Sequence, residues 1–442
     1  MNSKLTLWSI TVGLGGFLFG LDTAVISGAE QKIQALWHLS DLFQGLAIAM
    51  ALYGTVFGAG FGGVPADKIG RKKTLIWIGL LFFVSAVGAA ISQDVYTFMF
   101  FRFIGGLSIG ASSVVAPVYI SEIAPPEYRG RMVIAFQFNI VLGIVIAYGS
   151  NYLLQGLGGE NDWRWMLGVV AVPSLLFSFL MLFTPESPRW LLLHKGDEAT
   201  ARQVLAITEP NVDKAVNEIK DSAKDDVQGV KETFFSKKFS VPIILAFLFA
   251  FFNQMSGINA IIYFAPRIFK MTGLGDSTAL LSTVGIGVVN LIFTILGWFL
   301  IDKFGRRTLM YIGSVGYIIS LAMIAMAFST QSFGNVTFFI FMFIASHAIG
   351  QGAVIWVFIS EIFPNSVRAS GMSWGCLTHW VFAAVIANLF PLFAMNPKIG
   401  GAVIFGFFAI MMVFQLIFVW RMMPETKGVS LEDLQKQLIK ER

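Results

Sequence analysis

Two charged residues of opposite sign stand inside apolar runs of the sequence. Asp22 lies in the first such run and Arg102 in the fourth. An ionised side chain within a membrane is costly unless it is paired or hydrated, so pairing the two would stabilise both. Arginine stays protonated, whereas the pKa of an aspartate falls beside an arginine and rises on burial. The pair is therefore either a purely structural ion pair or a site that takes up and releases a proton.

The second half of the chain offers a different chemistry. Its apolar runs hold no acidic or basic residue deep inside, so a site there cannot neutralise a charged ligand. They do hold amides, hydroxyls and aromatic rings, and an amide supplies both a donor and an acceptor. That set suits a neutral polyol, which needs many hydrogen-bonding groups and a flat apolar face.

The elements that must position these residues are predicted to be membrane-spanning helices. The 442-residue chain is 56% hydrophobic and 13% charged, with a mean hydropathy of +0.73, whereas a soluble domain carries about 25% charged residues. The excess falls in runs of about 20 residues, long enough to cross a hydrocarbon core of roughly 30 Å. The first run is interpreted as a retained helix, not a signal peptide. We predict twelve spans, at 8–28, 44–64, 74–92, 96–120, 131–153, 165–184, 241–266, 278–301, 308–329, 336–360, 369–393 and 402–422.

The basic residues predict the orientation of these spans. Of the 31 lysines and arginines, 25 lie at the termini or in loops that follow even-numbered spans. Such residues favour the cytoplasmic side, so we expect both termini in the cytoplasm and an even number of spans. The loop bias also accounts for the net charge of +5, and no nucleic-acid partner is expected. We place the chain in the inner cell membrane.

Three motifs occur twice, about 240 residues apart. The pairs are Asp67–Lys72 with Asp302–Arg307, Glu122–Arg129 with Glu361–Arg368, and Pro185–Ser187 with Pro424–Thr426. Such self-similarity indicates duplication, and in membrane proteins two repeats usually enclose a substrate site. The predicted division is a six-helix half at 1–184, a helical linker at 185–240, a second six-helix half at 241–423 and a tail at 424–442.

Motifs typical of enzymes and metal centres are missing from the sequence. The single Cys376 excludes an internal disulfide and a cysteine metal cluster. It lies in an apolar run, where inert packing is the expected role. No nucleophile elbow or phosphate loop is present, so we expect no enzyme activity, no cofactor and no metal.

Several longer motifs resemble those of a known family. They are Gly15–Gly28, the two Asp-x-x-Gly-Arg loops, Arg102–Gly106, Pro185–Trp190, Gln254–Asn259 and Pro424–Gly428. Over essentially its whole length the chain resembles the sugar porter family of the major facilitator superfamily. That family includes bacterial proton-linked xylose, galactose and glucose carriers and the human facilitative glucose transporters. The resemblance implies an all-α membrane protein with two six-helix halves and short cytoplasmic helices between them.

The resemblance also implies which residues meet the substrate. Residues that match sugar contacts of the family are Gln137, Gln254, Asn259, Asn290 and Trp356, and aromatic residues that match the lining of the same cavity are Phe19, Tyr263 and Trp380. His347 and His379 depart from the family pattern, which has a phenylalanine and an amide there. They are either neutral hydrogen-bonding groups or a source of pH dependence. For the amides, the alternative is helix–helix packing within lipid.

A further set of charged residues is expected at the cytoplasmic helix ends. Its members are Asp67, Arg71, Glu122, Arg129, Glu186, Arg189, Asp302, Arg306, Glu361, Arg368 and Glu425. Isolated surface ion pairs contribute little to stability. A network that joins two halves is different, because it forms in one conformation and breaks in the other. We interpret this set as a gate that stabilises the outward-open state.

The expected function is proton-coupled symport of a neutral monosaccharide by alternating access. Proton-linked members of the family carry an aspartate at the position of Asp22, whereas the human facilitative members carry an asparagine. Ile144 matches the glucose carriers and favours a hexose, glucose first, with xylose and galactose as alternatives. A facilitative uniporter and a non-transporting sensor stay open, although the short tail after Glu425 argues against the sensor. The expected partners are the sugar, a proton and the lipid bilayer, and we expect a monomer.

Overall fold

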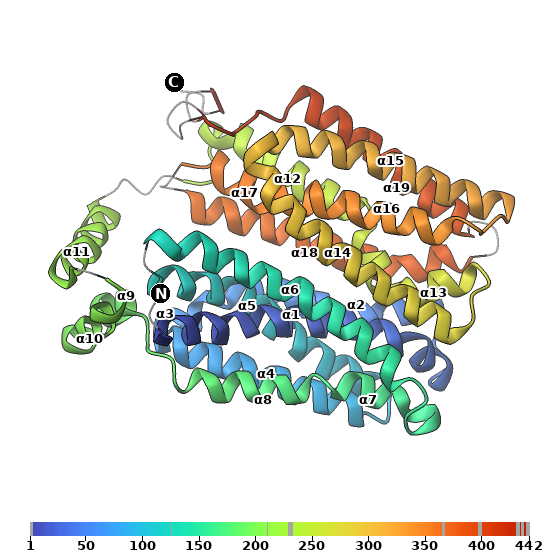
Figure 1. Ribbon diagram of the computed structural model, residues 1–442, viewed down its shortest axis with the longest axis horizontal. Helices are drawn as coiled ribbons and strands as arrows, with labels where there is room; N and C mark the ends of the chain where they lie inside the picture. Colours follow the sequence, from blue (N-terminus) through green and yellow to red (C-terminus); the bar gives the residue numbers. More distant parts are fainter. Residues whose placement is uncertain are drawn as a thin grey trace. The chain divides into compact units, whose positions relative to one another are not determined.

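The computed structural model describes residues 3–124, 126–209, 211–228, 233–364, 367–396 and 400–429, with Leu434, Gln437 and Leu438. This part of the chain is helical and contains no strand (Figure 1). The helices are α1 (Ser3–Leu36), α2 (Asp41–Phe61), α3 (Gly63–Ile69), α4 (Arg71–Ile91), α5 (Val95–Ile123), α6 (Pro126–Leu154), α7 (Asp162–Gly168), α8 (Ala171–Met181), α9 (Pro188–Trp190), α10 (Glu198–Thr208), α11 (Val212–Gln228), α12 (Ser240–Met255), α13 (Ile258–Met271), α14 (Asp276–Phe304), α15 (Arg306–Thr330), α16 (Val336–Ile349), α17 (Gln351–Ile362), α18 (Arg368–Ala394) and α19 (Gly400–Arg421).

Twelve helical segments of the described residues are long and apolar enough to cross a membrane. This confirms the predicted number of spans, and α10 and α11 are the short helices expected in the linker. The segments are Ile10–Leu36, Asp41–Phe61, Arg71–Ile91, Val95–Ile123, Ala135–Leu154, Gly159–Met181, Lys237–Met271, Asp276–Phe304, Arg306–Thr330, Val336–Ile362, Arg368–Ala394 and Gly400–Arg421.

The first spanning helix is longer than predicted. The apolar run ends near residue 28, but α1 continues to Leu36. Residues 29–36 read Ala-Glu-Gln-Lys-Ile-Gln-Ala-Leu, all good or moderate helix formers, so nothing in their propensity ends the helix. Glu30 within this extension is completely buried, which requires partners that the apolar pattern alone does not reveal.

Two spanning segments are interrupted at glycines. The break between α12 and α13 falls at Gly257, whose φ of +82° lies in the left-handed region. A Cβ at this position would also lie 2.5 Å from the ring of Phe408. The break between α16 and α17 falls at Gly350. Interrupted helices expose backbone groups and polar side chains at membrane depth, where many membrane proteins build their binding sites.

The chain divides into two compact units that are each assembled from several stretches of sequence. Unit 1 consists of Met1–Thr23, Tyr53–Ala147 and Arg164–Lys231, and unit 2 consists of Ala24–Leu52, Tyr148–Trp163 and Glu232–Arg442. Helices α1, α2 and α6 therefore contribute residues to both units. The predicted division into halves at 1–184 and 241–423 stays a prediction.

Within unit 1, α4 packs along α5 and α8, and α1 packs directly on the backbone of α6. A Cβ at Gly20 of α1 would lie 1.8 Å from the carbonyl oxygen of Ile140. In the other direction, a Cβ at Gly143 of α6 would lie 2.2 Å from the carbonyl oxygen of Phe17. Small residues allow this approach, and it fixes the part of α1 that carries Asp22.

The linker helices of unit 1 are joined by exposed charged residues. Glu198 at the start of α10 accepts hydrogen bonds from Lys220 of α11 at 2.7 Å and from Arg202 at 2.9 Å. These bonds, that from Lys220 first, lower the pKa of the Glu198 carboxyl. Arg202 also donates to Asp213 of α11 at 2.6 Å. The two helices thus form a small paired element. Short helices were predicted here from the sequence, but their pairing was not.

Within unit 2, α15 lies along α19 and α16, and α12 lies along α18. Aromatic rings fill the space between α12, α17 and α19. The ring of Phe249 stacks on Phe358 with centroids 5.1 Å apart and meets Phe418 edge-on at 6.2 Å. This packing holds the segment of α12 that leads into the break at Gly257.

Candidate functional site

The predicted pair of buried charges is present in unit 1. Arg102 of α5 donates from one terminal nitrogen to Asp22 Oδ1 of α1 at 3.0 Å, and from the other to the Asp22 carbonyl at 3.4 Å. Each residue is 1% exposed. The two charges therefore compensate each other in a place where either one alone would be strongly unfavourable.

The second carboxylate oxygen of Asp22 takes no part in this bonding to Arg102. Asp22 Oδ2 is buried, and no described residue donates a hydrogen bond to it. Gly105 of α5 borders this oxygen, since a Cβ there would lie 3.4 Å from it. A carboxylate with one oxygen held by an arginine and the other unoccupied has an open position for a proton. The geometry thus combines charge compensation at Oδ1 with an Oδ2 that no described residue occupies.

The amides predicted to meet the substrate gather around the break at Gly257 in unit 2. Asn259, at the start of α13, donates to Gln254 Oε1 of α12 at 2.7 Å. The amide nitrogen of Gln254 lies 3.2 Å from both ring nitrogens of His379 on α18. Because the break brings Gln254 and Asn259 together from two helix ends, the cluster presents donors and acceptors at membrane depth.

Aromatic rings flank this amide cluster. The ring of His379 lies 5.3 Å from Trp356 of α17 and 4.8 Å from Trp380, between centroids. Tyr263 of α13 is completely buried. Indole faces beside amides are the combination that the flat apolar face and the hydroxyl groups of a sugar require.

The remaining candidate residues lie in several places. Asn290 of α14 is 8% exposed and accepts from Thr294 at 3.4 Å. His347 of α16 forms its hydrogen bond with Tyr317 of α15, rather than with the amides of the cluster. Phe19 on α1 and Gln137 on α6 belong to unit 1 and are both partly buried. The structure thus brings Gln254, Asn259, His379, Trp356 and Trp380 together in unit 2.

The first copy of the repeated charged motif forms a bonded set in unit 1. Arg71 donates to both oxygens of Glu122, at 2.9 and 3.1 Å, and to Asp67 at 3.0 Å. Glu186 accepts from the backbone N–H of Lys72 at 3.1 Å. The bidentate geometry between arginine and carboxylate is the strong form of this interaction.

The second copy repeats the arrangement in unit 2. Arg306 donates to Glu361 at 2.9 Å and to Asp302 at 3.3 Å. Glu425 accepts from the backbone N–H groups of Arg306 and Arg307, at 2.9 and 3.0 Å. The internal repeat read from the sequence is therefore also a repeat of hydrogen bonds.

A glycine makes each copy possible. Gly70 and Gly305 have φ values of +98° and +90°. A Cβ at Gly70 would lie 2.2 Å from Glu186 Oε2, and one at Gly305 would lie 2.6 Å from Glu425 Oε2. Each glycine thus admits a backbone conformation that other residues avoid and leaves room for the carboxylate.

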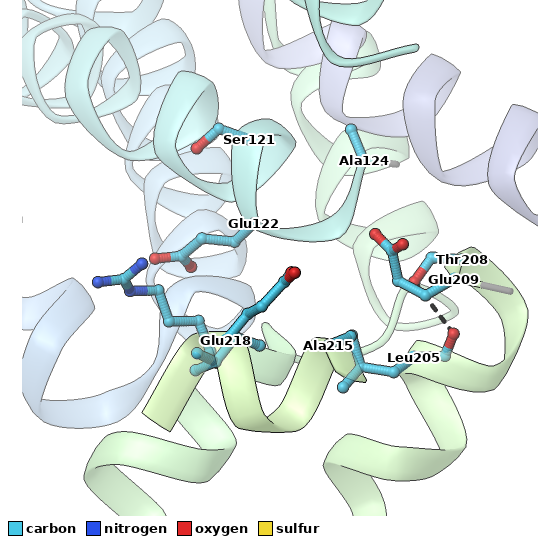
Figure 2. Close-up of a pocket in the computed structure, with 10 residues that line it drawn as sticks. Ser121, Glu122, Ala124, Leu205, Thr208, Glu209, Ala215 and Glu218 are labelled. Atoms are coloured by element: carbon cyan, nitrogen blue, oxygen red, sulfur yellow. Dashed lines mark hydrogen bonds between the residues drawn. The ribbon is translucent and has the colours of Figure 1, made fainter. Parts of the chain in front are cut away.

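Each charged set borders a cavity. In unit 1 a cavity of about 520 Å³ is lined by Glu122 and Arg189 together with residues of the linker helices, and Figure 2 shows Glu122 at its wall. In unit 2 a cavity of about 350 Å³ is lined by Glu361 and Arg368. The side chain of Arg129, the remaining predicted member, lies outside what the structure describes. Bonds between the two sets stay a prediction.

Unit 2 contains a second buried ion pair, which was not predicted from the sequence. Arg267 of α13 donates to both oxygens of Glu30 on α1, one of them at 2.8 Å. Arg267 also donates to Gln34 at 2.6 Å, and Gln44 of α2 donates to Glu30 at 3.0 Å. Both charged residues lie in helices long enough to span, at 0% and 6% exposure. The available signal was two opposite charges, each just beyond the end of an apolar run.

The chain has twelve helical segments that could span a membrane, a duplicated charged motif, a buried acid–arginine pair and amides at a helix break. Together these features define a membrane carrier of the major facilitator type. Residues 8–438 match the family model described as "Sugar (and other) transporter", and the chain belongs to this family. This confirms the resemblance stated above, and with it the expectation of a transporter rather than an enzyme.

Individual relatives cover the chain almost completely. It is 37% identical to the arabinose-proton symporter of Bacillus subtilis, over 98% of this chain and 95% of that protein. It is 35% identical to the glucose transporter GlcP of Staphylococcus epidermidis, over 99% and 98%. Among solved structures, the inward open conformation of the xylose transporter XylE from Escherichia coli matches with a TM-score of 0.86 at 31% identity, covering 98% of this chain and 100% of that one.

Proposed function

We propose that this protein is a proton-coupled symporter that moves a neutral monosaccharide across the inner cell membrane by alternating access. Its similarity to a bacterial arabinose-proton symporter supports the class of substrate and the coupling ion. The loop distribution of lysine and arginine supports placing both termini in the cytoplasm.

The observation that carries the coupling is the state of the Asp22 carboxylate. Arg102 holds Oδ1 at 3.0 Å, while Oδ2 is buried and receives no hydrogen bond from a described residue. A purely structural pair would gain from satisfying both oxygens, because an unsatisfied buried acceptor is costly. A proton-binding site needs the second oxygen open. The geometry therefore favours the coupled carrier over a uniporter with a structural ion pair.

The amides at the helix break carry sugar recognition in this proposal. Gln254, Asn259 and His379 supply hydrogen bonds, and Trp356 and Trp380 supply apolar faces. None of the five carries a fixed charge, which fits a neutral sugar. We propose a hexose, glucose first. The alternatives are galactose and the pentoses named for its relatives, xylose and arabinose.

Uptake into liposomes tests the proposal. The purified protein is reconstituted and offered labelled D-glucose, D-galactose, D-xylose and L-arabinose, each with and without an inward proton gradient. We expect at least one sugar to accumulate above its external concentration, and only with the gradient. Sugar that only equilibrates, to the same extent with and without the gradient, would indicate a uniporter. Sugar binding without any uptake would indicate a sensor.

Substitution of Gln254 tests the location of the sugar site. Gln254→Ala removes hydrogen bonds of a fully buried amide, so we expect affinity to weaken by about 1–3 kcal/mol. Tryptophan fluorescence quenching measures it, because two tryptophans flank His379. Gln93→Ala is the control, since Gln93 is exposed in the loop between α4 and α5. Unchanged affinity in Gln254→Ala would place the site elsewhere.

A further inference from the structure

Two buried glutamines outside the proposed sugar site belong to a chain of side-chain hydrogen bonds that leads to this site. Gln415 of α19 donates to the hydroxyl of Ser314 on α15 at 2.8 Å. Gln351, the first residue of α17, donates to Gln415 Oε1 at 2.8 Å. Gln351 and Ser314 are 0% exposed and Gln415 is 1% exposed. Uncharged amides this deep in a membrane protein are costly unless their hydrogen bonds are made.

The line continues without interruption to the sugar-binding amides. Asn253 donates to Gln351 Oε1 at 3.3 Å, and Gln254 donates to Asn253 Oδ1 at 2.8 Å. Asn259 then donates to Gln254 Oε1 at 2.7 Å. Five consecutive bonds therefore run from Asn259 to Ser314, and in each of them the side chain nearer to Asn259 is the donor.

This common direction has a physical consequence. An amide has a donor end and an acceptor end. If one amide turned by 180°, its NH₂ would face a neighbouring NH₂ and its oxygen a neighbouring oxygen. Such a mismatch leaves buried donors and acceptors unsatisfied, which is unfavourable for each group. The chain therefore selects one orientation for every member, and hydrogen bonds in series strengthen one another.

The chain also connects the two helix breaks of unit 2. Gln351 directly follows the break at Gly350, and Gln254 and Asn259 flank the break at Gly257. Residues at a break lack the support of a continuous helix on one side. A bond from Asn253 to Gln351 ties the two irregular segments together, and Gln415 and Ser314 attach them to the regular helices α19 and α15.

We propose that Gln351 and Gln415 are positioning residues for sugar recognition, which hold the Gln254 amide with its NH₂ toward Asn253 and its oxygen toward Asn259. They act through Gln254 and do not themselves touch the sugar. The proposal rests on the proposed function, because it assumes that Gln254 binds the substrate. It predicts that changes in α17 and α19, behind the site, alter sugar affinity.

A double-mutant cycle on the reconstituted, full-length protein tests this role, with D-glucose and D-xylose as probes. Gln351→Met keeps the approximate side-chain volume and removes both hydrogen bonds. We expect the sugar Kd to rise about five- to ten-fold, as the loss of one oriented bond predicts. In a Gln254→Ala background the same substitution should change Kd less than two-fold, because the residue through which it acts is gone.

Matched variants separate positioning from general destabilisation. Ser314→Ala removes the acceptor at the end of the chain and should raise Kd about three-fold. Ser320→Ala is its control, because Ser320 is equally buried on α15 but bonds only within its own helix. Gln351→Glu should keep most of the wild-type sugar affinity that Gln351→Met loses. A buried, protonated carboxyl group offers one donor and one acceptor, as the Gln351 amide does here.

The outcomes are distinguishable. If the wild-type protein neither binds nor accumulates any sugar, the proposed function is overturned, and the positioning role with it. A wild-type protein that binds sugar while Gln351→Met keeps the same Kd overturns the positioning role alone. Equal fold-changes in the wild-type and Gln254→Ala backgrounds also overturn it, because independent effects add. If Gln351→Met fails to fold, the sugar Kd of Ser314→Ala is compared with that of its control Ser320→Ala. Equal Kd values in these two variants overturn the positioning role.

Discussion

At the scale of single residues, the Asp22–Arg102 pair makes the sharpest prediction. Asp22→Asn retains the shape of the side chain but removes the proton-binding site. We expect it to abolish accumulation driven by a proton gradient, so that internal sugar only equals external sugar, while counterflow and binding persist. Asp94→Asn is the matched control, because Asp94 caps α5 outside the spans through bonds to Tyr96 and Thr97. Gradient-driven uptake at the wild-type level in Asp22→Asn would contradict the coupling role.

The Glu30–Arg267 pair makes a prediction about stability. Glu30→Gln leaves the arginine buried without its counter-charge, which typically costs about 3–5 kcal/mol. We expect a marked drop in the thermal unfolding midpoint, measured in detergent by tryptophan fluorescence. The exchanged pair Glu30→Arg with Arg267→Glu should recover part of the loss. A midpoint unchanged in Glu30→Gln would mean that water or lipid headgroups already compensate the charge.

The residue types in the sequence revealed the Asp22–Arg102 pair but not the Glu30–Arg267 pair. Asp22 and Arg102 stand in the middle of apolar runs, so their chemistry marks them directly. Glu30 lies just past an apolar run and Arg267 just past another, where charges are usually solvated. Only the three-dimensional contact between α1 and α13 reveals that both are buried. Sequence spacing cannot supply that contact, because the two residues are 237 positions apart.

At the scale of elements, the break at Gly257 determines how Gln254 and Asn259 meet. Gly257→Ala would force a left-handed backbone on a residue with a side chain, at about 1–2 kcal/mol, and would also press a Cβ against Phe408. We expect lower stability together with weaker sugar binding, measured by fluorescence quenching. The break itself was not predicted, because the apolar pattern of 241–266 runs through it as one continuous span.

A second glycine provides the control for that substitution. Gly273 has a φ of +90° but no atom within 4 Å of a Cβ, so Gly273→Ala carries only the backbone cost. We expect it to lower stability by about 1–2 kcal/mol and to leave sugar affinity unchanged. Equal losses of affinity in both variants would show that the break does not position the amides.

At the scale of the whole molecule, the duplicated charged sets should act as equivalents. Glu122→Gln weakens the bonds from Arg71, and Glu361→Gln weakens the bond from Arg306. Hydrogen bonds to charged groups contribute about 1.5–3 kcal/mol. If the sets stabilise the outward-open state, either variant should shift the population toward inward-open by roughly ten-fold or more, with binding retained and active uptake impaired.

Distances between spin labels at the predicted cytoplasmic ends of α5 and α17 measure this shift. Lengthening in both variants is the expected result. A longer distance in only one variant would show that the two copies differ in role. An unchanged distance in both would show that each set only stabilises its own helix ends. The repeat was readable from sequence because each copy needs the same glycine, arginine and glutamate. Its bonding to Glu186 and Glu425 follows from the positive φ of those glycines.

If Asp22 is the proton site proposed above, its buried pair with Arg102 also gives the carrier an electrical character. Since arginine stays protonated, the pair is neutral while Asp22 is ionised and carries one positive charge once Asp22 binds a proton. The loaded carrier would then respond to the membrane potential and the empty one would not. Moving one charge through the whole field is worth about 2.3 kcal/mol per 100 mV. Voltage alone, without any difference in pH, should therefore drive net inward current when a neutral sugar is present.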